Sequence, residues 1–293
     1  MEHRPAKVRS WLFAPGDSAR KMEKALGGEA DQVILDLEDA VAIDNKPEAR
    51  AMVAQFLADN ADQRARMWVR VNPLDGEWTQ ADLEAVMPAR PGGIMLPKAE
   101  SGEDMRTLDA MLTPLEVVHG IEAGTTPVTV LATETAAAMF GTGTYRGTPR
   151  LAGMSWGAED LADSIGALGN TEPDGSYRPT YELARSLCLL GAAAAGVPAI
   201  ETIMADFRDL DGLKTRAEMV RRDGYKGMLA IHPAQVPVIN AAFTPSDDEL
   251  AEAREIVALF EANPGVGTIG WRKGMLDRPH LSRARQLLAQ IDE

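Results

Sequence analysis

Eight short apolar segments recur along this 293-residue chain, and seven of them run directly into a polar or charged residue. In the clearest, Val33 to Asp39, three apolar residues are followed by three acids within four positions, whereas the first segment ends in the Pro15-Gly16 turn. The segments are Val8 to Phe13, Val33 to Asp39, Trp68 to Asn72, Gly93 to Lys98, Val128 to Glu134, Leu151 to Asp160, Ala199 to Glu201 and Met228 to His232. A parallel barrel carries its catalytic residues at the C-terminal ends of its strands, so this pattern predicts both a fold and a site.

Helix-like stretches alternate with these segments. They are Ser18 to Leu26, Lys46 to Asp59, Thr79 to Met87, Gly102 to Met111, Thr135 to Phe140, Tyr181 to Ala195, Leu210 to Asp223 and Pro233 to Ala242. Alternation of strand and helix implies parallel pairing. Eight evenly spaced strands favour a closed barrel over an open doubly wound sheet, and a single barrel needs roughly 250 residues. We therefore predict an α/β fold, a (β/α)8 TIM barrel over residues 1–243, although length alone also allows two domains.

The pattern changes after Ala242, where a C-terminal helical extension over residues 244–293 is expected. Ser246 and Glu249 have the spacing of a capping box, which predicts a helix from there to about Glu261. A turn-rich stretch follows, and a last amphipathic helix is expected over about Leu281 to Ile291. Such a tail either covers a site or a neighbouring subunit, or only packs against the barrel.

Composition excludes several classes of protein. A net charge of −14 argues against a nucleic-acid partner, because phosphate binding needs a positive surface. No apolar run approaches the roughly 20 residues of a membrane span, so no membrane is expected. The stretch from Met1 to Lys7 lacks the apolar core of a secretory signal, and the single cysteine, Cys188, cannot form an intramolecular disulfide. These features predict a cytoplasmic protein.

Glu134 and Asp160 are the strongest candidates for chemistry. Each lies just beyond an apolar strand, on what would be adjacent strands five and six of the barrel. Two carboxylates that converge from neighbouring strands can hold a hard divalent cation such as Mg²⁺, which takes one or two protein carboxylates and leaves room for substrate. The alternative is that each acid caps a following helix.

Arg70 ends strand three, where an inward guanidinium would need an anionic partner. That partner is either a substrate oxygen or one of the acids Asp36, Glu38 and Asp39. Strand alternation places Asp36 and Glu38 on one face, so one of them is expected to bind at the site or to orient Arg70.

Lys98 and His232 end two further strands. Lys98 is placed to meet a phosphate or carboxylate, or else to extend along the barrel rim with its ammonium in water. His232 has no second histidine at ligand spacing, so a structural role or a contact to a cofactor is expected rather than a metal role.

Six runs of this sequence resemble the citrate lyase β-subunit family, within the Mg²⁺-dependent CoA-thioester lyases and HpcH/HpaI aldolases that include malyl-CoA and citramalyl-CoA lyases. The runs are Arg9 to Asp17, Leu35 to Val41, Val69 to Asn72, Leu96 to Ser101, Gly157 to Leu161 and Ile231 to Gln235. The matches follow in order from Arg9 to about Leu287, so the resemblance covers nearly the whole chain.

The resemblance implies a (β/α)8 barrel, usually a homotrimer or a dimer of trimers. It implies Mg²⁺ held by Glu134 and Asp160, and it places the catalytic arginine and glutamate on Arg70 and Glu38. In related lyases an aspartate of the C-terminal segment reaches a neighbouring subunit's site, and here the match is Asp277. Contacts to a CoA thioester are expected at Lys98, Arg20 and His232.

The sequence departs from the family pattern at several positions. The order of residues around Lys273 and Gly274 differs, which weakens the match of Asp277. Strand seven has Ile200-Glu201-Thr202 where the family often has aspartate, a change that affects either the pocket or only a packing contact. Before strand eight, Met228 stands where a lysine is common, which would alter CoA contacts.

The resemblance implies a lyase that cleaves or forms a β-hydroxyacyl-CoA by a retro-aldol and Claisen-type reaction, giving a 2-oxo acid and an acyl-CoA. In this hypothesis Arg70 stabilises the enolate oxygen, and Asp277 or Glu38 moves the proton. Two alternatives remain open. One is a thioesterase of the malyl-CoA type on the same scaffold, and the other is the β subunit of a citrate lyase complex acting on an acyl-carrier protein.

Overall fold

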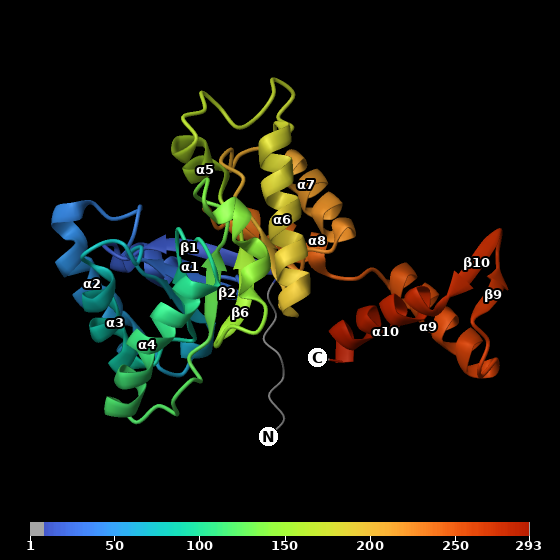
Figure 1. The fold of residues 1–293 in the computed structure, drawn as a ribbon, viewed down its shortest axis with the longest axis horizontal. Helices are drawn as coiled ribbons and strands as arrows, with labels where there is room; N and C mark the ends of the chain where they lie inside the picture. Colours follow the sequence, from blue (N-terminus) through green and yellow to red (C-terminus); the bar gives the residue numbers. More distant parts are fainter. Residues whose placement is uncertain (1–8, 293) are drawn as a thin grey trace. The chain divides into compact units, whose positions relative to one another are not determined.

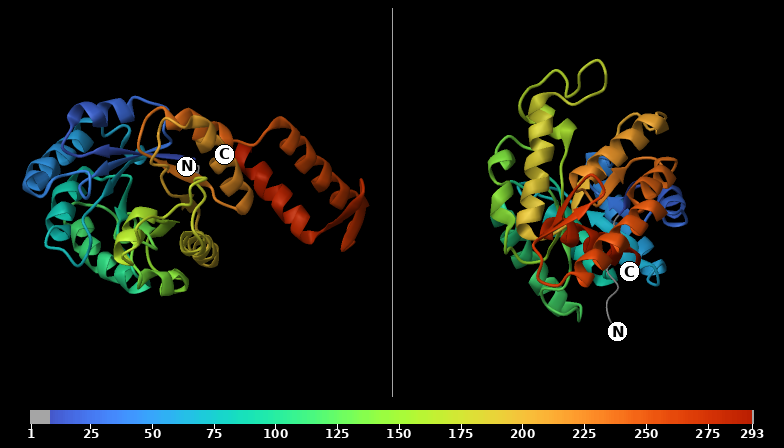
Figure 2. Two further views of the ribbon diagram at one scale, coloured as in Figure 1. Left: turned by 90° about the horizontal axis from the view of Figure 1, so that it is seen from above. Right: turned by 90° about the vertical axis from the view of Figure 1, so that its right-hand side faces the viewer.

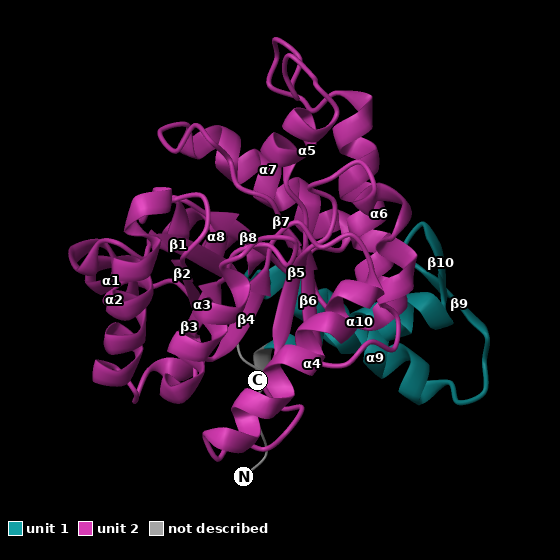
Figure 3. Cartoon of the chain, turned by 60° about the vertical axis from the view of Figure 1, so that its left-hand side comes forward, with its two compact units in different colours: residues 1–6, 244–293 teal, residues 7–243 magenta. Residues whose placement is uncertain are grey.

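The computed structural model describes residues 9–292, which divide into two compact units between Phe243 and Thr244 of the chain (Figure 3). Residues 9–243 form the first unit, and residues 244–292 form the second. Val8 and the stretch from Met1 to Lys7 lie outside the described residues. None of the helices within residues 9–292 combines the length and the apolar character needed to cross a membrane.

Eight parallel strands close into a barrel in sequence order, with helices packed outside them (Figures 1 and 2). The strands are β1 (Ser10–Pro15), β2 (Gln32–Asp36), β3 (Met67–Arg70), β4 (Gly93–Leu96), β5 (Val128–Leu131), β6 (Leu151–Ser155), β7 (Ala199–Glu201) and β8 (Gly227–Ala230). Closure occurs where β1 pairs with β8, with Trp11 opposite Leu229. The predicted (β/α)8 barrel is confirmed, including the closure that the sequence only favoured.

Within residues 9–243, eight α-helices belong to the barrel unit. They are α1 (Ala19–Leu26), α2 (Lys46–Asp59), α3 (Thr79–Val86), α4 (Gly102–Val118), α5 (Ala158–Ser164), α6 (Pro179–Ala195), α7 (Leu210–Asp223) and α8 (Gln235–Phe243). Helices α2 and α7 have the predicted bounds. Helix α4 continues past Met111 to Val118 with Pro114 inside it, and the helix predicted over Thr135 to Phe140 is wrong, because only a short 3-10 turn over Ala138–Phe140 forms there.

Side-chain alternation along the strands divides the core into two layers. An inner cluster fills the barrel and includes Trp11, Ile34, Trp68, Leu131 and Ile200. An outer and larger cluster packs the strands against the helices. The large ring of Trp68 has room because its neighbour is Gly93, where an added Cβ would lie 2.3 Å from the ring. The filled interior leaves the strand ends and their loops to build a site.

The C-terminal unit contains α9 (Asp247–Ala262), the hairpin of β9 (Thr268–Trp271) and β10 (Gly274–Asp277), and α10 (Arg278–Asp292). The predicted capping box is present, since the Ser246 hydroxyl accepts from the Glu249 backbone N–H and the Glu249 carboxylate accepts from that of Ser246. The hairpin was not predicted. This unit has its own small core, in which Ile256 and Phe260 of α9 cluster with Leu276 of β10.

Candidate active site

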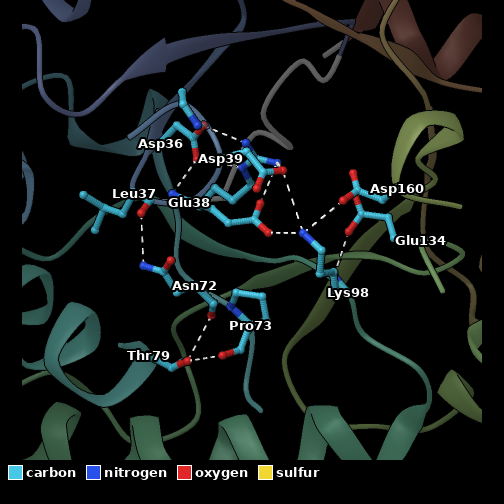
Figure 4. A network of polar contacts seen from close by, with 12 residues as sticks. Asp36, Leu37, Glu38, Asp39, Asn72, Pro73, Thr79, Lys98, Glu134 and Asp160 are labelled. Atoms are coloured by element: carbon cyan, nitrogen blue, oxygen red, sulfur yellow. Dashed lines mark hydrogen bonds and ion pairs between the residues drawn. The ribbon is translucent and has the colours of Figure 1, made fainter. Parts of the chain in front are cut away.

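Five predicted site residues converge at the carboxyl ends of the barrel strands. Figure 4 shows Lys98 between Glu38 on one side and Glu134 and Asp160 on the other. Glu38 follows β2, Arg70 ends β3, Lys98 follows β4, Glu134 follows β5 and Asp160 lies in the first turn of α5, after β6. Because parallel strands end at the same mouth of a barrel, these consecutive loops face one another.

Arg70 is held by acids from the neighbouring strand. Its Nε and Nη2 atoms donate to the two carboxylate oxygens of Asp36 at 2.7 and 2.6 Å, and Asp36 lies opposite Arg70 in the strand register. Its Nη1 atom lies 2.8 Å from a Glu38 oxygen, and its guanidinium lies 4.8 Å from the centre of the Phe13 ring. Burial alone would lower the pKa of Arg70, but the charges of Asp36 and Glu38 outweigh burial and raise it. Both predicted acids therefore orient the arginine, which stays a buried cation.

Lys98 connects the remaining acids. Its Nζ atom lies 2.5 Å from Glu38, 3.0 Å from Asp160 and 3.8 Å from Asp39. Its backbone N–H donates to Glu134 at 2.7 Å, in a left-handed conformation with φ of 50°. Burial lowers the pKa of Lys98, but the hydrogen bonds and charges of Glu38 and Asp160 raise it overall. In this structure Lys98 is thus the central cation of the mouth rather than a side chain extended into water.

Glu134 and Asp160 form the acid pair predicted to hold a metal. Glu134 is buried, and burial together with the charges of Asp160 and Glu38 raises its pKa to about 8. Gly157 makes room for this side chain, because an added Cβ there would lie 2.7 Å from the Glu134 Cγ. Asp160 is partly exposed at the mouth. A carboxyl driven toward its neutral form by burial and by nearby like charges is one that a divalent cation would return to its ionised form.

The donor chemistry of this pair suits a hard cation. Both side chains offer carboxylate oxygens, the ligands that Mg²⁺ prefers, and two protein carboxylates leave positions for water and substrate. Within residues 9–292 the structure contains no group of three or more His, Cys, Asp or Glu side chains that could hold a metal by themselves. The arrangement therefore fits an open metal site and does not resemble a closed structural one.

Glu38 is the carboxyl that touches both cations. Burial raises its pKa, the charges of Arg70 and Lys98 oppose that rise, and the charge of Asp39 adds to it. Asp39 itself is mostly exposed at the rim. A buried carboxyl with a raised pKa, within reach of the site, is suited to moving a proton.

Of the three residues predicted to contact CoA, Lys98 belongs to this network, whereas Arg20 and His232 make no hydrogen bond or ion pair with it among the described residues. The His232 ring stacks on Phe207 with centres 4.6 Å apart, and its Nδ1 accepts from the Ala234 backbone N–H at 3.1 Å. Arg20 is exposed on α1 and makes no hydrogen bond or ion pair to any described residue. The predicted contacts of Arg20 and His232 to CoA stay predictions.

Asp277 belongs to the C-terminal unit, at the end of β10. Its carboxylate lies 2.5 Å from Nδ1 of His280, and this hydrogen bond lowers the pKa of Asp277. The side chain is partly exposed and ionised at neutral pH, and its role in catalysis stays a prediction.

Glu201 points away from the barrel interior. Its neighbour Ile200 belongs to the inner cluster, so alternation turns Glu201 outward, where one oxygen accepts from the Trp156 indole N–H at 3.1 Å. Burial raises its pKa to about 7. The departure at this position therefore changes a packing contact behind the strands.

Sequence reasoning missed Lys46 and Asn72, which support the loops of Glu38 and Arg70 from behind. Lys46 is the first residue of α2 and is buried, yet its sequence position resembles that of any surface lysine at a helix start. The signal available was its place seven residues after the acidic run, in a chain that buries few lysines.

Comparison with known proteins agrees with this geometry. Residues 9–233 match the model of the HpcH/HpaI aldolase/citrate lyase family. A (3S)-malyl-CoA thioesterase of Cereibacter sphaeroides is 36% identical, with 100% of this chain and 97% of the relative covered. A citrate lyase subunit beta-like protein of Mycobacterium tuberculosis is also 36% identical, with coverage of 97% and 95%.

Among solved structures, CitE of Mycobacterium tuberculosis in complex with magnesium, acetoacetate and coenzyme A is similar to this chain. The TM-score is 0.78 at 32% identity, over 98% of this chain and 99% of the CitE chain. Family membership rests on two findings: the family model matches most of the chain, and relatives are 36% identical over nearly their whole length. The chain belongs to the HpcH/HpaI aldolase/citrate lyase family.

Proposed function

We propose that this protein is a Mg²⁺-dependent carbon–carbon lyase that cleaves or forms a β-hydroxyacyl-CoA, such as malyl-CoA or citramalyl-CoA. The single observation that carries the proposal is the convergence of Glu134 and Asp160 with Lys98, Arg70 and Glu38 at one barrel mouth. Five carboxylates there, counting Asp36 and Asp39, face two cations. The surplus of negative charge matches the requirement for a bound divalent cation.

Glu134 and Asp160 would hold the metal. When bound, Mg²⁺ would supply Lewis-acid polarisation of the oxygen on the carbon that becomes the 2-oxo group. The CitE relative was solved with magnesium, acetoacetate and coenzyme A, a set that corresponds to a metal, an oxo acid and a thioester carrier. Release of Lys98 from Asp160 would free that carboxylate for the cation.

Arg70 would stabilise the negative charge that develops on the thioester oxygen. Cleavage removes the proton of the β-hydroxyl group and breaks the Cα–Cβ bond, whose electron pair forms the enolate of the acyl-CoA. Protonation at Cα then completes the products. A guanidinium fixed by Asp36 is preorganised for this charge, and such preorganised donors act where charge forms in the transition state.

Glu38 and Asp277 are the candidates for the two proton transfers, the removal of the β-hydroxyl proton and the protonation of Cα. Glu38 is buried beside Arg70 and has a raised pKa, which suits an acid that donates at Cα. Asp277 is kept ionised by its lowered pKa, which also makes it a weak base, and it would accept the hydroxyl proton if the C-terminal unit of a neighbouring subunit delivers it. This assignment goes with the homotrimer, or dimer of trimers, and the cytoplasmic location that we also propose.

The CoA portion would be bound by cations at the mouth. On a chain with net charge −14, the phosphates of CoA need local positive groups. Arg20 is exposed and without a partner in the described residues, Lys98 can exchange its acids for an anionic ligand, and the stacked His232 offers a ring edge.

A thioesterase is the second candidate, because curated relatives that span the whole chain are (3S)-malyl-CoA thioesterases. In that reaction water attacks the thioester carbonyl, and the thiol of CoA leaves. A citrate lyase subunit beta of Haemophilus influenzae is more distant at 31% identity, so a free-standing enzyme is favoured over a complex subunit.

Product analysis tests the proposal. Purified protein is incubated with malyl-, methylmalyl-, citramalyl- and HMG-CoA, with Mg²⁺ or with EDTA, and products are identified by mass spectrometry. An oxo acid (a 2-oxo acid from the malyl-type thioesters, a 3-oxo acid from HMG-CoA) plus a shortened acyl-CoA, formed only with Mg²⁺, supports the lyase. Free CoA plus an intact hydroxy acid supports the thioesterase. Turnover in EDTA at the full rate would contradict the metal assignment in both reactions.

A further inference from the structure

Lys46 is a buried cation whose ammonium binds only neutral oxygens within residues 9–292. It begins α2, and its ammonium donates to the backbone carbonyls of Leu37 and Glu38 at 3.0 Å each and to the side-chain oxygen of Asn72 at 2.6 Å. Only 8% of the residue is exposed. A lysine that gives up water for neutral oxygens needs all three of its donors satisfied, which is what the structure shows.

The three acceptors belong to the two segments that follow β2 and β3 and hold Arg70 in place. We call these segments the arginine clamp. Leu37 and Glu38 continue from β2 into the acidic loop, and Glu38 is the residue that lies 2.8 Å from Arg70. Asn72 lies two residues beyond Arg70, on the segment that continues from β3. Lys46 therefore joins the backbone that carries Glu38 to the segment that carries Arg70.

The Asn72 side chain extends this support to α3. Its amide donates to the Leu37 carbonyl at 3.0 Å and to the carboxylate of Asp82 at 2.7 Å, and its backbone N–H donates to the same Asp82 oxygen at 2.9 Å. The Arg50 Nε donates to the other oxygen of Asp82 at 2.9 Å. Figure 4 shows the inner part of this network, from Glu38 through Leu37 to Asn72.

We propose that Lys46 is a positioning residue that fixes the spacing between Glu38 and Arg70, and so holds the guanidinium where the enolate oxygen forms. The inference rests on the lyase reaction proposed above. Without the ammonium, the Asn72 side-chain oxygen loses its donor, the Leu37 carbonyl keeps only the Asn72 amide, and the Glu38 carbonyl keeps only a backbone N–H of its own loop. The loop that carries Glu38 is then held by fewer bonds. Arg70 would keep Asp36 but lose the fixed position of Glu38, whose carboxylate is its only other short ion pair in the described residues.

The test compares Lys46→Met with Arg150→Met as a matched control. Arg150 is also a fully buried cation, paired with Glu116 and Asp109 just before β6, so its loss reports on stability alone. We expect Lys46→Met to lower kcat roughly 10- to 100-fold with the KM for the thioester changed less than about threefold, because small displacements of a catalytic group have effects of this size. Lys46→Arg should restore part of kcat, and Arg150→Met should change the melting temperature without changing kcat.

A double-mutant cycle decides whether Lys46 acts through Arg70. In an Arg70→Met background the further change Lys46→Met should lower kcat by less than about threefold, since the group that it positions is already absent. An equal loss in both backgrounds would overturn the proposal. If Lys46→Met does not fold, Asn72→Ala removes the third acceptor and takes its place in the same cycle.

Amide hydrogen exchange supplies a readout that does not need catalysis. The backbone N–H of Leu37 donates to the Arg70 carbonyl and that of Glu38 to the Asp36 carboxylate, so both report on the clamp. Lys46→Met should speed exchange at least about tenfold over residues 36–41 and leave it unchanged in Arg150→Met. Unchanged exchange in Lys46→Met would overturn the inference. A wild-type protein that cleaves none of the thioesters would instead overturn the proposed function, while the exchange result still judges Lys46.

Discussion

Two clusters of buried charge lie at opposite ends of the barrel strands and have opposite character. At the amino end, Arg150 precedes β6 and its side chain is fully buried with Glu116 of α4. Its guanidinium donates to both Glu116 oxygens at 2.6 and 2.7 Å, to Asp109 at 2.5 Å and to the Thr113 hydroxyl at 2.9 Å. At the carboxyl end, two cations face five acids around Glu134.

The pKa values of Glu116 and Glu134, one buried glutamate from each cluster, express this difference. Burial raises the pKa of Glu116, but hydrogen bonds from Arg150, Thr126 and Gly124 outweigh burial and lower it to about 2. Burial, followed by the charges of Asp160 and Glu38, raises the pKa of Glu134 to about 8, and the one backbone hydrogen bond that it accepts, from Lys98, does not offset this rise. The amino-end cluster is complete without a ligand, whereas the carboxyl-end cluster has acids to spare. Completeness indicates a role in stability, and surplus charge indicates a role in binding.

Removal of one surplus acid should have the largest effect on activity. Glu134→Ala takes away a proposed metal ligand and should lower kcat/KM by about 1,000-fold, or about 4 kcal/mol of transition-state stabilisation. Above about pH 8, where Glu134 is ionised, the variant relieves like-charge repulsion, so stability without metal should not fall there. Steady-state kinetics across a Mg²⁺ titration, together with thermal melts in EDTA, measure both. Activity within a few-fold of wild type would remove Glu134 from the site.

Removal of Arg150, the cation of the amino-end cluster, should lower stability and leave activity unchanged. Arg150→Met leaves Glu116 buried without its partner and should cost about 3 kcal/mol of unfolding free energy. Because the change lies at the amino end of the strands, kcat at a temperature where the variant is folded should equal that of wild type. Urea denaturation and initial rates check the two parts. A large loss of kcat with normal stability would break the division between the two ends.

The sequence predicted much of the carboxyl-end cluster because barrel geometry is repetitive. A short apolar strand followed by a polar residue marks a strand end, and parallel closure brings all such ends to one mouth. Glu38, Arg70, Lys98, Glu134 and Asp160 lie there for that reason alone. Two carboxylates on adjacent strands predicted a divalent cation such as Mg²⁺, and the resemblance strengthened that prediction. The thioester and Asp277 came from the resemblance alone, because strand spacing carries no information about the identity of an organic ligand.

Other parts of the site could not be predicted because they depend on contacts between loops. The central place of Lys98 follows from its left-handed backbone, with φ of 50°, and nothing in the local sequence requires that conformation. Lys46 reaches the site from the start of a helix, through backbone carbonyls that have no sequence signature. The β9–β10 hairpin was missed because its strands have four residues each and contain glycines, Gly270 and Gly274.

The pH dependence of stability should differ in sign between the two glutamates. The pKa of Glu134 is raised from an ordinary 4.5 to about 8, so the folded state binds more protons and its stability falls as pH rises from about 5 to 8. The slope should reach about 1 kcal/mol per pH unit and disappear in Glu134→Gln. Glu116, with a pKa of about 2, contributes stability that is present above pH 4.5 and lost as pH falls toward 2.

Urea melts at pH 5 to 8 in EDTA measure this slope, and Mg²⁺ should reduce it by favouring the ionised carboxylate. Glu201, whose pKa is raised to about 7, adds a slope of the same sign, so Glu201→Gln is measured in parallel. Isothermal titration in two buffers of different ionisation heat should show proton release when Mg²⁺ binds near pH 7. An identical slope in wild type and Glu134→Gln would contradict the raised pKa.

Substitution of Glu201 should have the smallest effect, and it tests whether a raised pKa is enough to identify a functional glutamate. It is a third buried glutamate with a raised pKa, yet it points away from the mouth and accepts from Trp156. Glu201→Gln keeps an acceptor for the indole N–H, so unfolding free energy should change by no more than about 1 kcal/mol and kcat by less than about twofold. Urea melts and initial rates check this. A loss of activity as large as that of Glu134→Ala would mean that a buried glutamate with a raised pKa takes part in catalysis whichever way it points. The expected small effect would show that the direction in which a strand-end carboxyl points decides its role.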